Sequence, residues 1–311
     1  MLPSALKFDT KVESMRSRTY KSNIAPQNGQ GPYSCDRNEV IVINVPTGGA
    51  NVLVPQESAV KFTMVATNGG DEGQVLLPRV GAHGAIRSIA VYSGSNLLEN
   101  ITQYGALARI MMDSHTSPGS LMTKDSIMLG TFTLLQGEVV RSPGATNMAA
   151  NGVSRRTYVV PLFSIMGVLH GPKYFPLYAA SASPIRIEIT LASPREFLHM
   201  AENIASVEVT DVEYIATIIE LGDPALAQLP SSEVSYHSLG VRNYQSSASL
   251  GAGSTTTVSF PIAAKVSSLK SLFVTPSVAS DNSANNRYTY SGAQDDTGIL
   301  HGTAKGIWCA L

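Results

Sequence analysis

The chain has 311 residues, which is enough for one large or two medium-sized domains. Its formal net charge is −1, so no global electrostatic field points to nucleic acid or to a membrane surface as a partner. Charged residues make up only 14% of the chain, and such a surface suits a protein that packs against copies of itself, because few charges must be desolvated there.

The first 32 residues show little hydrophobic periodicity and predict an N-terminal arm. Their basic residues outnumber Asp9 and Glu13; they are Lys7, Lys11, Arg16, Arg18 and Lys21. We expect a solvated tail that orders only on packing, with contact to nucleic acid or to a neighbouring subunit as the alternative. The start of the chain lacks the apolar core of a signal peptide, and no segment approaches ~18 uninterrupted apolar residues. We therefore expect synthesis in the cytoplasm.

Short segments rich in β-branched residues predict strands in the following region. Glu39–Val45 is nearly continuous in such residues, as a core strand should be. Val60–Met64 alternates between apolar and polar residues, which predicts one buried face. Ile86–Tyr92 predicts a further strand.

The hydrophobic period changes over Asn96–Asp113 and predicts one amphipathic helix. Its apolar residues recur every three to four positions: Leu97, Ile101, Tyr104, Leu107 and Met111. Asn96 and Glu99 are spaced as a capping pair at the helix start. Tyr104 and Leu107 are expected to be packing anchors of this helix.

Strands resume after this helix and alternate with glycine- and proline-rich turns. We predict strands at Ser126–Leu135, Thr157–Phe163, Ile185–Leu191 and Ser206–Glu220. Two Pro-Leu runs, Val159–Phe163 and Phe175–Tyr178, precede the alternating strand at Ile185–Leu191. This order is typical of the middle of a β-sandwich.

A connector rich in proline, alanine and serine at 222–236 separates two strand-bearing regions. After it, strands are predicted at Val241–Leu250, Thr255–Pro261 and Ser267–Thr275. The chain then closes on an apolar run at residues 306–311. We expect an all-β fold of jelly-roll sandwiches, with one helix in a long loop excursion.

No constellation of residues predicts enzymatic chemistry, so we expect no catalytic, cofactor-binding or metal-binding residues and no cofactor. The six histidines are scattered: His83, His115, His170, His199, His237 and His301. Asp71-Glu72 and Asp295-Asp296 lie in turn-rich segments, where solvated acids are favoured over a calcium site. The two cysteines, Cys35 and Cys309, are too few for a disulfide framework, and we expect reduced thiols.

The order of these segments resembles the double jelly-roll major capsid proteins of icosahedral double-stranded DNA viruses. That lineage includes adenovirus hexons, tailless membrane-containing phages and the nucleocytoplasmic large DNA viruses of algae and amoebae. The resemblance covers about residues 24–275. It is carried by the stretches Asn38–Val45, Ser88–Tyr104, Val160–Phe163, Phe175–Tyr178, Ile185–Leu191, Asp211–Ile215, Tyr244-Gln245 and Val266–Val274.

The resemblance implies a domain order of arm (1–32), first jelly roll (33–221), linker (222–236) and a short or truncated second jelly roll (237–311). Such a second barrel has eight strands, yet only about 75 residues follow residue 236. We therefore expect that the chain stops inside this barrel.

The implied function is that of a non-enzymatic capsid protein of the virion, assembled as homotrimeric, pseudo-hexameric capsomers. Its implied partners are copies of itself, minor capsid proteins and, through the basic arm, an internal membrane or the genome. The outer surface and the contacts between subunits would be formed by loops at 66–84, 113–124, 141–156 and 278–297.

Two other functions remain open from the sequence alone. A carbohydrate-binding or hydrolytic β-sandwich would need a concave aromatic or acidic face, and the single tryptophan and 7% aromatic content speak against one. The other alternative is a minor or penton-type capsid protein with a single jelly roll and an appended region.

Overall fold

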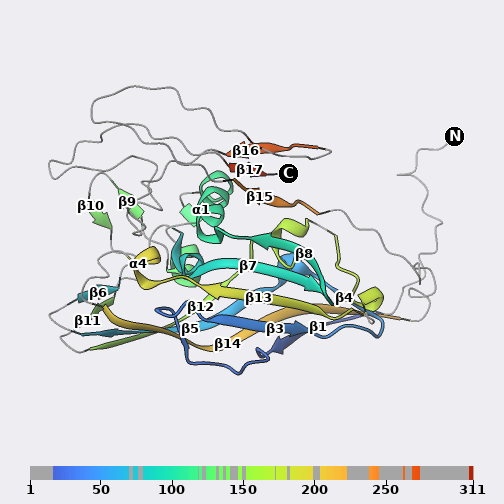
Figure 1. Cartoon of the computed structure of the whole chain (residues 1–311), viewed down its shortest axis with the longest axis horizontal. Coiled ribbons are helices and arrows are strands. Elements are labelled where there is room, and N and C mark those ends of the chain that lie inside the picture. The colour runs from blue at the N-terminus through green and yellow to red at the C-terminus, as the bar shows by residue number, and fades with distance from the viewer. Residues whose placement is uncertain are drawn as a thin grey trace.

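The computed structural model describes residues 17–69, 73–75, 80–117, 119–120, 124–130, 133–135, 138–140, 146–148, 152–171, 173–180, 183–198, 204–222, 238–244, 262, 268–273 and 308–310. Most of them lie in strands, and one helix exceeds seven residues (Figure 1). None of the helices within these ranges combines the length and the apolar character needed to cross a membrane.

Two antiparallel sheets form the body of the molecule. In sheet A the order is β1 (Ser17–Ile24), β14 (Ile204–Leu221), β5 (Ala59–Asn68) and β12 (Val153–Val160), with β2 (Tyr33–Ser34) and β4 (Asn51–Leu53) also paired to β14. In sheet B the order is β3 (Val40–Val45), β13 (Ile185–Leu191), β7 (Ile86–Ser93) and β8 (Asn96–Ile101).

The path of the chain between these sheets is that of a jelly roll. β1 and β2 share the position beside β14, so eight strand positions are filled. In chain order they lie in sheets A, B, A, B, B, A, B and A, apart from the short β4. Eight antiparallel strands that wind between two sheets in this way define the jelly roll. The predicted fold class is confirmed for this barrel.

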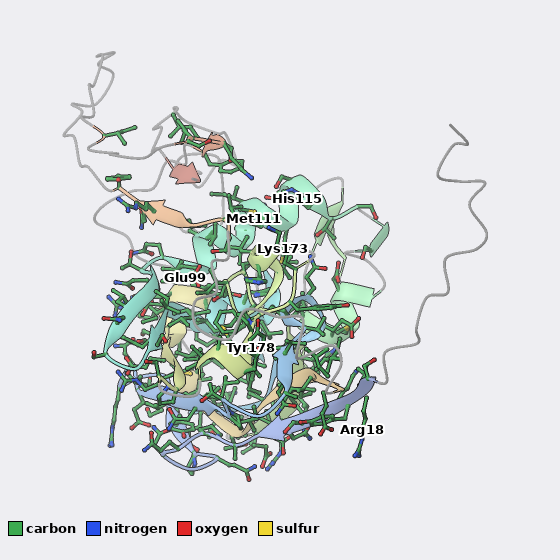
Figure 2. All side chains as sticks on the ribbon, turned by 90° about the vertical axis from the view of Figure 1, so that its right-hand side faces the viewer. Arg18, Glu99, Met111, His115, Lys173 and Tyr178 are labelled. Carbon is green, nitrogen blue, oxygen red and sulfur yellow. The ribbon has the colours of Figure 1, made fainter. Side chains whose placement is uncertain are left out.

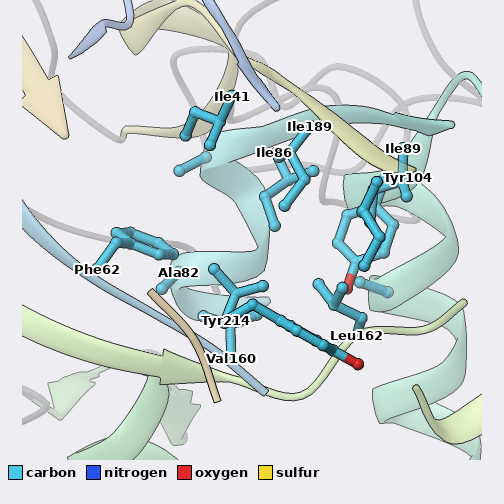
Figure 3. Packing of buried hydrophobic residues seen from close by; sticks show 14 of the residues in the cluster. Ile41, Phe62, Ala82, Ile86, Ile89, Tyr104, Val160, Leu162, Ile189 and Tyr214 are labelled. Atoms are coloured by element: carbon cyan, nitrogen blue, oxygen red, sulfur yellow. The ribbon is translucent and has the colours of Figure 1, made fainter. Parts of the chain in front are cut away.

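The core lies between the sheets and is filled by aliphatic and aromatic side chains. Along β13 the inward residues Ile185, Ile187, Ile189 and Leu191 are at most 2% exposed, and they alternate with half-buried outward residues. Side chains from both sheets meet there (Figure 3): Ile41, Phe62, Ile86, Ile89, Val160, Ile189 and Tyr214. The period-two pattern read from the sequence therefore reports the buried face correctly.

The segment predicted as a single helix over Asn96–Asp113 is a strand followed by a helix. Asn96–Ile101 forms β8, paired with β7, and helix α1 spans Tyr104–His115. The predicted capping pair is wrong, because Glu99 is a buried strand residue and the residue before the helix is Gln103. Gly94, at φ +58°, allows the tight turn that folds β8 back onto β7. Pairing with β7 thus outweighs the local helical period.

The strand predicted at Ser126–Leu135 is also wrong in its first half. Residues Lys124–Leu129 form helix α3, and only Thr133–Leu135 is a strand, β9, paired with β10 (Glu138–Val140). A short apolar run such as Ile127–Leu129 does not distinguish a strand from a helix by periodicity. Gly130, at φ +66°, ends the helix in the left-handed conformation that favours glycine.

Several short elements complete the described structure. β6 (Gly73–Val75) pairs with β11 (Thr146–Met148), and helix α4 spans Pro194–Phe197. The 3-10 helices are η2 (Pro55–Glu57), η3 (Gly81–Ala85), η4 (Val168–His170) and η5 (Leu177–Ala180).

A separate three-stranded sheet follows the jelly roll in the chain. Its order is β15 (Val241–Asn243), β17 (Trp308–Ala310) and β16 (Ser271–Phe273). Strands were predicted around β15 and β16, whereas the prediction at Thr255–Pro261 lies outside the described residues. β15 runs next to β8, where the Asn243 amide donates to Thr102 Oγ1 at 3.5 Å (Figure 1). The three-stranded sheet therefore contacts the side of the jelly roll that carries α1.

Replacing Gly81 with alanine should destabilise the fold by about 2 kcal/mol or more. Gly81 has φ +59°, and a Cβ atom there would lie 2.4 Å from the backbone oxygen of Leu129 at the end of α3. The matched control is Gly171→Ala, since Gly171 has φ +76° and no atom within 4 Å of the added carbon. Urea denaturation of both variants tests this. Equal losses in the two would refute the close approach of η3 to α3.

Candidate assembly surfaces

The structure brings several buried polar side chains together around one segment, Pro161–His170, which contains the first Pro-Leu run. Tyr104 Oη accepts a hydrogen bond from the Phe163 backbone N–H at 3.1 Å. Tyr214 Oη donates to the Met166 carbonyl at 2.9 Å. Helix α1 and strand β14 thus hold the segment from two sides.

Glu99 provides the third attachment of this segment. Its carboxylate accepts a hydrogen bond from the Ser164 hydroxyl and another from the Ile165 N–H at 3.0 Å. Its second oxygen, Oε1, is buried without a hydrogen-bond partner. Burial raises the pKa of Glu99 to about 7, although both hydrogen bonds oppose the increase. The carboxyl group is therefore protonated in a substantial fraction of molecules near neutral pH.

His83 lies beside the same segment and is neutral. Its Nδ1 lies 2.9 Å from Tyr104 Oη, and its ring packs 5.1 Å from the ring of Phe163. Burial lowers the pKa of His83 to about 3, because the charged imidazolium would be desolvated. One ring nitrogen is occupied by the tyrosine, so His83 acts as part of the packing around Tyr104.

The other titratable residues considered in the sequence are dispersed. His170 is buried and His115 ends α1, whereas His199, His237, His301, Asp71-Glu72 and Asp295-Asp296 lie outside the described residues. Cys35 is a free, buried thiol, and burial raises its pKa. Within the described ranges, no three His, Cys, Asp or Glu side chains form a group that could hold a metal ion.

Two ion pairs cross the strands on the outer face of sheet A. Lys61 and Glu213 lie 3.1 Å apart across β5 and β14, and Arg155 and Asp211 lie 2.7 Å apart. The hydroxyls of Thr63 and Thr157 share a hydrogen bond of 2.9 Å on the same face. These contacts leave a sheet face whose charges partly cancel.

The outer face of sheet B is poorer in charge. On β13 its outward residues are Arg186, Glu188 and Thr190, and Arg186 and Glu188 form an ion pair of 2.9 Å. Apolar side chains on the neighbouring strands are exposed: Val40 by 40%, Leu97 by 52% and Leu98 by 39%. A sheet face with few charges and several exposed apolar residues is the surface expected of a subunit that packs on another protein.

Two of the predicted loop regions meet at one end of the barrel. The β6–β11 pairing joins the 66–84 segment to the 141–156 segment, with Gln74 opposite Asn147. The 113–124 region follows α1, whereas 278–297 lies outside the described residues. The described strand of one region is therefore paired with that of the other.

Part of the predicted N-terminal arm is an edge strand. Ser17–Ile24 pairs along its whole length with β14, from Ser17 opposite Leu221 to Ile24 opposite Tyr214. Arg18 lies on this strand at the periphery of the molecule (Figure 2), and Lys21 is exposed as well. The remaining basic residues of the arm, Lys7, Lys11 and Arg16, lie outside the described residues.

Sequence reasoning anticipated Tyr104 and Leu107 as packing anchors, and both are buried. It missed Glu99, Ser164 and Tyr214 as partners of the Pro161–His170 segment. A signal for Glu99 existed in the turn Ser93-Gly94-Ser95-Asn96, which favours a hairpin and would place Glu99 on an inward strand position.

No protein-family model matches the chain, and no curated protein matches it. Among solved structures it is similar to VP54 of PBCV-1, as fitted into the virophage Sputnik, at 14% identity and a TM-score of 0.46, covering 69% of this chain and 46% of that one. It is similar to the faustovirus major capsid protein at 10% identity and a TM-score of 0.42, covering 68% and 56%. It is similar to the mavirus major capsid protein at 13% identity and a TM-score of 0.39, covering 74% of this chain and 53% of that one. The chain spans about half the length of these solved structures.

Proposed function

We propose that this chain is a structural subunit of an icosahedral viral capsid and acts by self-assembly. The observation that carries the proposal is the combination of an aliphatic-filled jelly roll with ion-paired charges on the outer faces of both sheets. Burying such sheet faces against other subunits costs little desolvation free energy. The resemblance of the ordered segments to double jelly-roll capsid proteins supports the same role.

Jelly rolls also occur in lectins and cupins, so the fold alone does not select a function. A cupin-like site would lie inside the barrel, where this chain places side chains such as Ile43, Leu53 and Ile89. A sugar site on a sheet face would use aromatic platforms. On sheet B the outward aromatic residue of β7, Tyr92, is already covered by the Arg186 guanidinium, 4.7 Å from the ring centre. These features favour the structural role.

We further propose a domain order of arm (1–32), jelly roll (33–221), linker (222–236) and second region (237–311), in which β1 of the arm completes sheet A of the jelly roll. Three chains would form a capsomer with a pseudo-sixfold outline, because each contributes two barrel-like regions. Copies of the chain, minor capsid proteins and, through the basic arm, a membrane or the genome would be its partners in the virion. The contact between β15 and β8 supports a fixed arrangement of the two regions.

Light scattering coupled to size exclusion tests the proposed stoichiometry. The full chain should elute with three times its mass of 32.9 kDa, and this mass should persist on dilution. A stable monomer that binds or cleaves a glycan would refute the structural role and favour the carbohydrate-binding alternative.

A further inference from the structure

The outer face of sheet B carries a pattern of charge and size that is complementary to itself. Three rows of outward residues cross the sheet, and the registers extend two of them across all four strands. One row is Asn44, Arg186, Tyr92 and Leu97; the next is Val42, Glu188, Ala90 and Asn100. The first row holds the positive charge and the large aromatic ring, whereas the second holds the negative charge and the small alanine.

We propose that this face, defined by these eight residues, docks onto the same face of a second copy of the chain. Two such faces can pack about a two-fold axis that lies in the interface, perpendicular to β13 and level with Ile187. This axis places each Arg186 opposite the Glu188 of the other copy. It also places each Tyr92 opposite an Ala90, so a large residue meets a small one.

The alternative two-fold axis, parallel to β13, is disfavoured by the same residues. It would place Arg186 opposite Arg186 and Glu188 opposite Glu188, and like charges across an interface are repulsive. The order of charges along β13 therefore selects antiparallel stacking of the two β13 strands.

The charged groups on the face are held in place before docking. The Arg186 guanidinium lies 4.7 Å from the Tyr92 ring centre and 2.9 Å from the Glu188 carboxylate. Their side chains are 40% and 29% exposed, so both remain accessible to a second copy. Because Arg186 is already ordered, little side-chain entropy is lost on docking. Arg87 is the only charged residue of β7, and it lies at the end of the face.

Described segments occupy both edges of sheet B, which favours its outer face over its edges as the docking surface. Along β3, the Gln27 N–H donates to the Val42 carbonyl at 2.7 Å, and the Asn28 amide donates to the Val40 carbonyl at 2.8 Å. At the opposite edge, β15 runs beside β8. A second copy would therefore stack on the sheet rather than extend it.

The size of the face predicts a weak contact. Four strands of about seven residues cover roughly 400 Å², about half of the ~800 Å² per partner of a standard interface. We expect this face to associate only at high protein concentration, and to join chains or capsomers that are already formed. The role of this contact as a link between neighbouring capsomers rests on the proposed function. The self-association of the sheet B face does not depend on that function.

Charge reversal tests the contact in the full-length chain. Sedimentation velocity over a range of concentrations measures the dissociation constant for pairing of the smallest stable species, whether that species is a monomer or a trimer. This pairing is the association step that the variants test. Arg186→Glu and Glu188→Arg should each weaken this step at least tenfold, because like charges then face each other. The double variant restores opposite charges across the axis and should recover the association of the unmodified chain.

Arg155→Glu, which breaks the exposed ion pair on sheet A, is the matched control and should leave the step unchanged. Single reversals without effect, a double variant as weak as the singles, or no association of the unmodified chain would each overturn the proposal. If the chain forms a trimer but these variants do not behave as expected, the sheet B contact is refuted and the proposed capsid function stands. If the chain forms no trimer, the proposed capsid function is weakened and the sheet B contact is not.

Discussion

Replacing Glu99 with glutamine should stabilise the protein at neutral and alkaline pH but not in acid. The pKa of Glu99 is raised from 4.5 to about 7 in the folded state. Between these values the folded protein holds the proton that the unfolded chain has released, so rising pH costs stability. Above pH 7 the loss of unfolding free energy reaches roughly 3 kcal/mol, since each pKa unit corresponds to ~1.4 kcal/mol. Glutamine keeps the size of the side chain without the charge.

The comparison must use the difference in unfolding free energy between variant and wild type at each pH. His83 changes stability in the opposite direction, because its lowered pKa makes the folded state gain stability as pH rises from about 3 to 6.5. That contribution cancels in the difference. Denaturant unfolding at pH 4.5, 6 and 7.5 should show the advantage of Glu99→Gln growing. The exposed Glu57→Gln variant serves as control, and a difference that is flat with pH would rule out a buried, proton-retaining Glu99.

Removal of a single hydroxyl group in Tyr104→Phe should destabilise the fold by about 3 kcal/mol. The phenol oxygen satisfies the Phe163 N–H and contacts Nδ1 of His83, and all three residues meet where α1 packs on the Pro161–His170 segment. Phenylalanine would fill the same volume and leave both nitrogen atoms buried without that oxygen. The loss should appear as a lower denaturation midpoint with an unchanged m-value.

Tyr174→Phe is the matched control for this prediction, because Tyr174 is 56% exposed and its hydroxyl can be solvated. It should change stability by less than about 0.5 kcal/mol. Similar losses in the two variants would mean that the hydrogen bonds of Tyr104 contribute little, and that its ring alone anchors α1.

Strands that alternate in burial were predictable from the sequence. Ile185–Leu191 has the predicted bounds because one face is buried in sheet B and the other is outward, which produces strict alternation. Ser206–Glu220 was predicted within two residues of β14 for the same reason. The central strands of both sheets therefore follow from local pattern.

The hairpin of β7 and β8 shows where local pattern fails. Leu97, Ile101 and Tyr104 recur at helical spacing, yet Ile101 is the last residue of a strand and Tyr104 the first of a helix. Pairing with β7 supplies backbone hydrogen bonds that the periodicity cannot represent. Tertiary context overrides a weak helical preference in this segment.

The buried network around Pro161–His170 could not be predicted from the sequence for a different reason. Glu99 and Ser164 are 65 positions apart, and Tyr214 lies 48 positions beyond Met166. Nothing local marks such residues as partners, because the sandwich topology alone brings them together. The sheet B face is similar, since its two complementary rows depend on the registers of four strands.

Electron microscopy of the purified full-length chain tests the central claim, that its function lies in how the barrel walls pack together. The account predicts compact particles with threefold symmetry and a pseudo-sixfold outline at low concentration, and sheets or shells of these particles on concentration. A uniform field of single, barrel-sized particles at every concentration would contradict it.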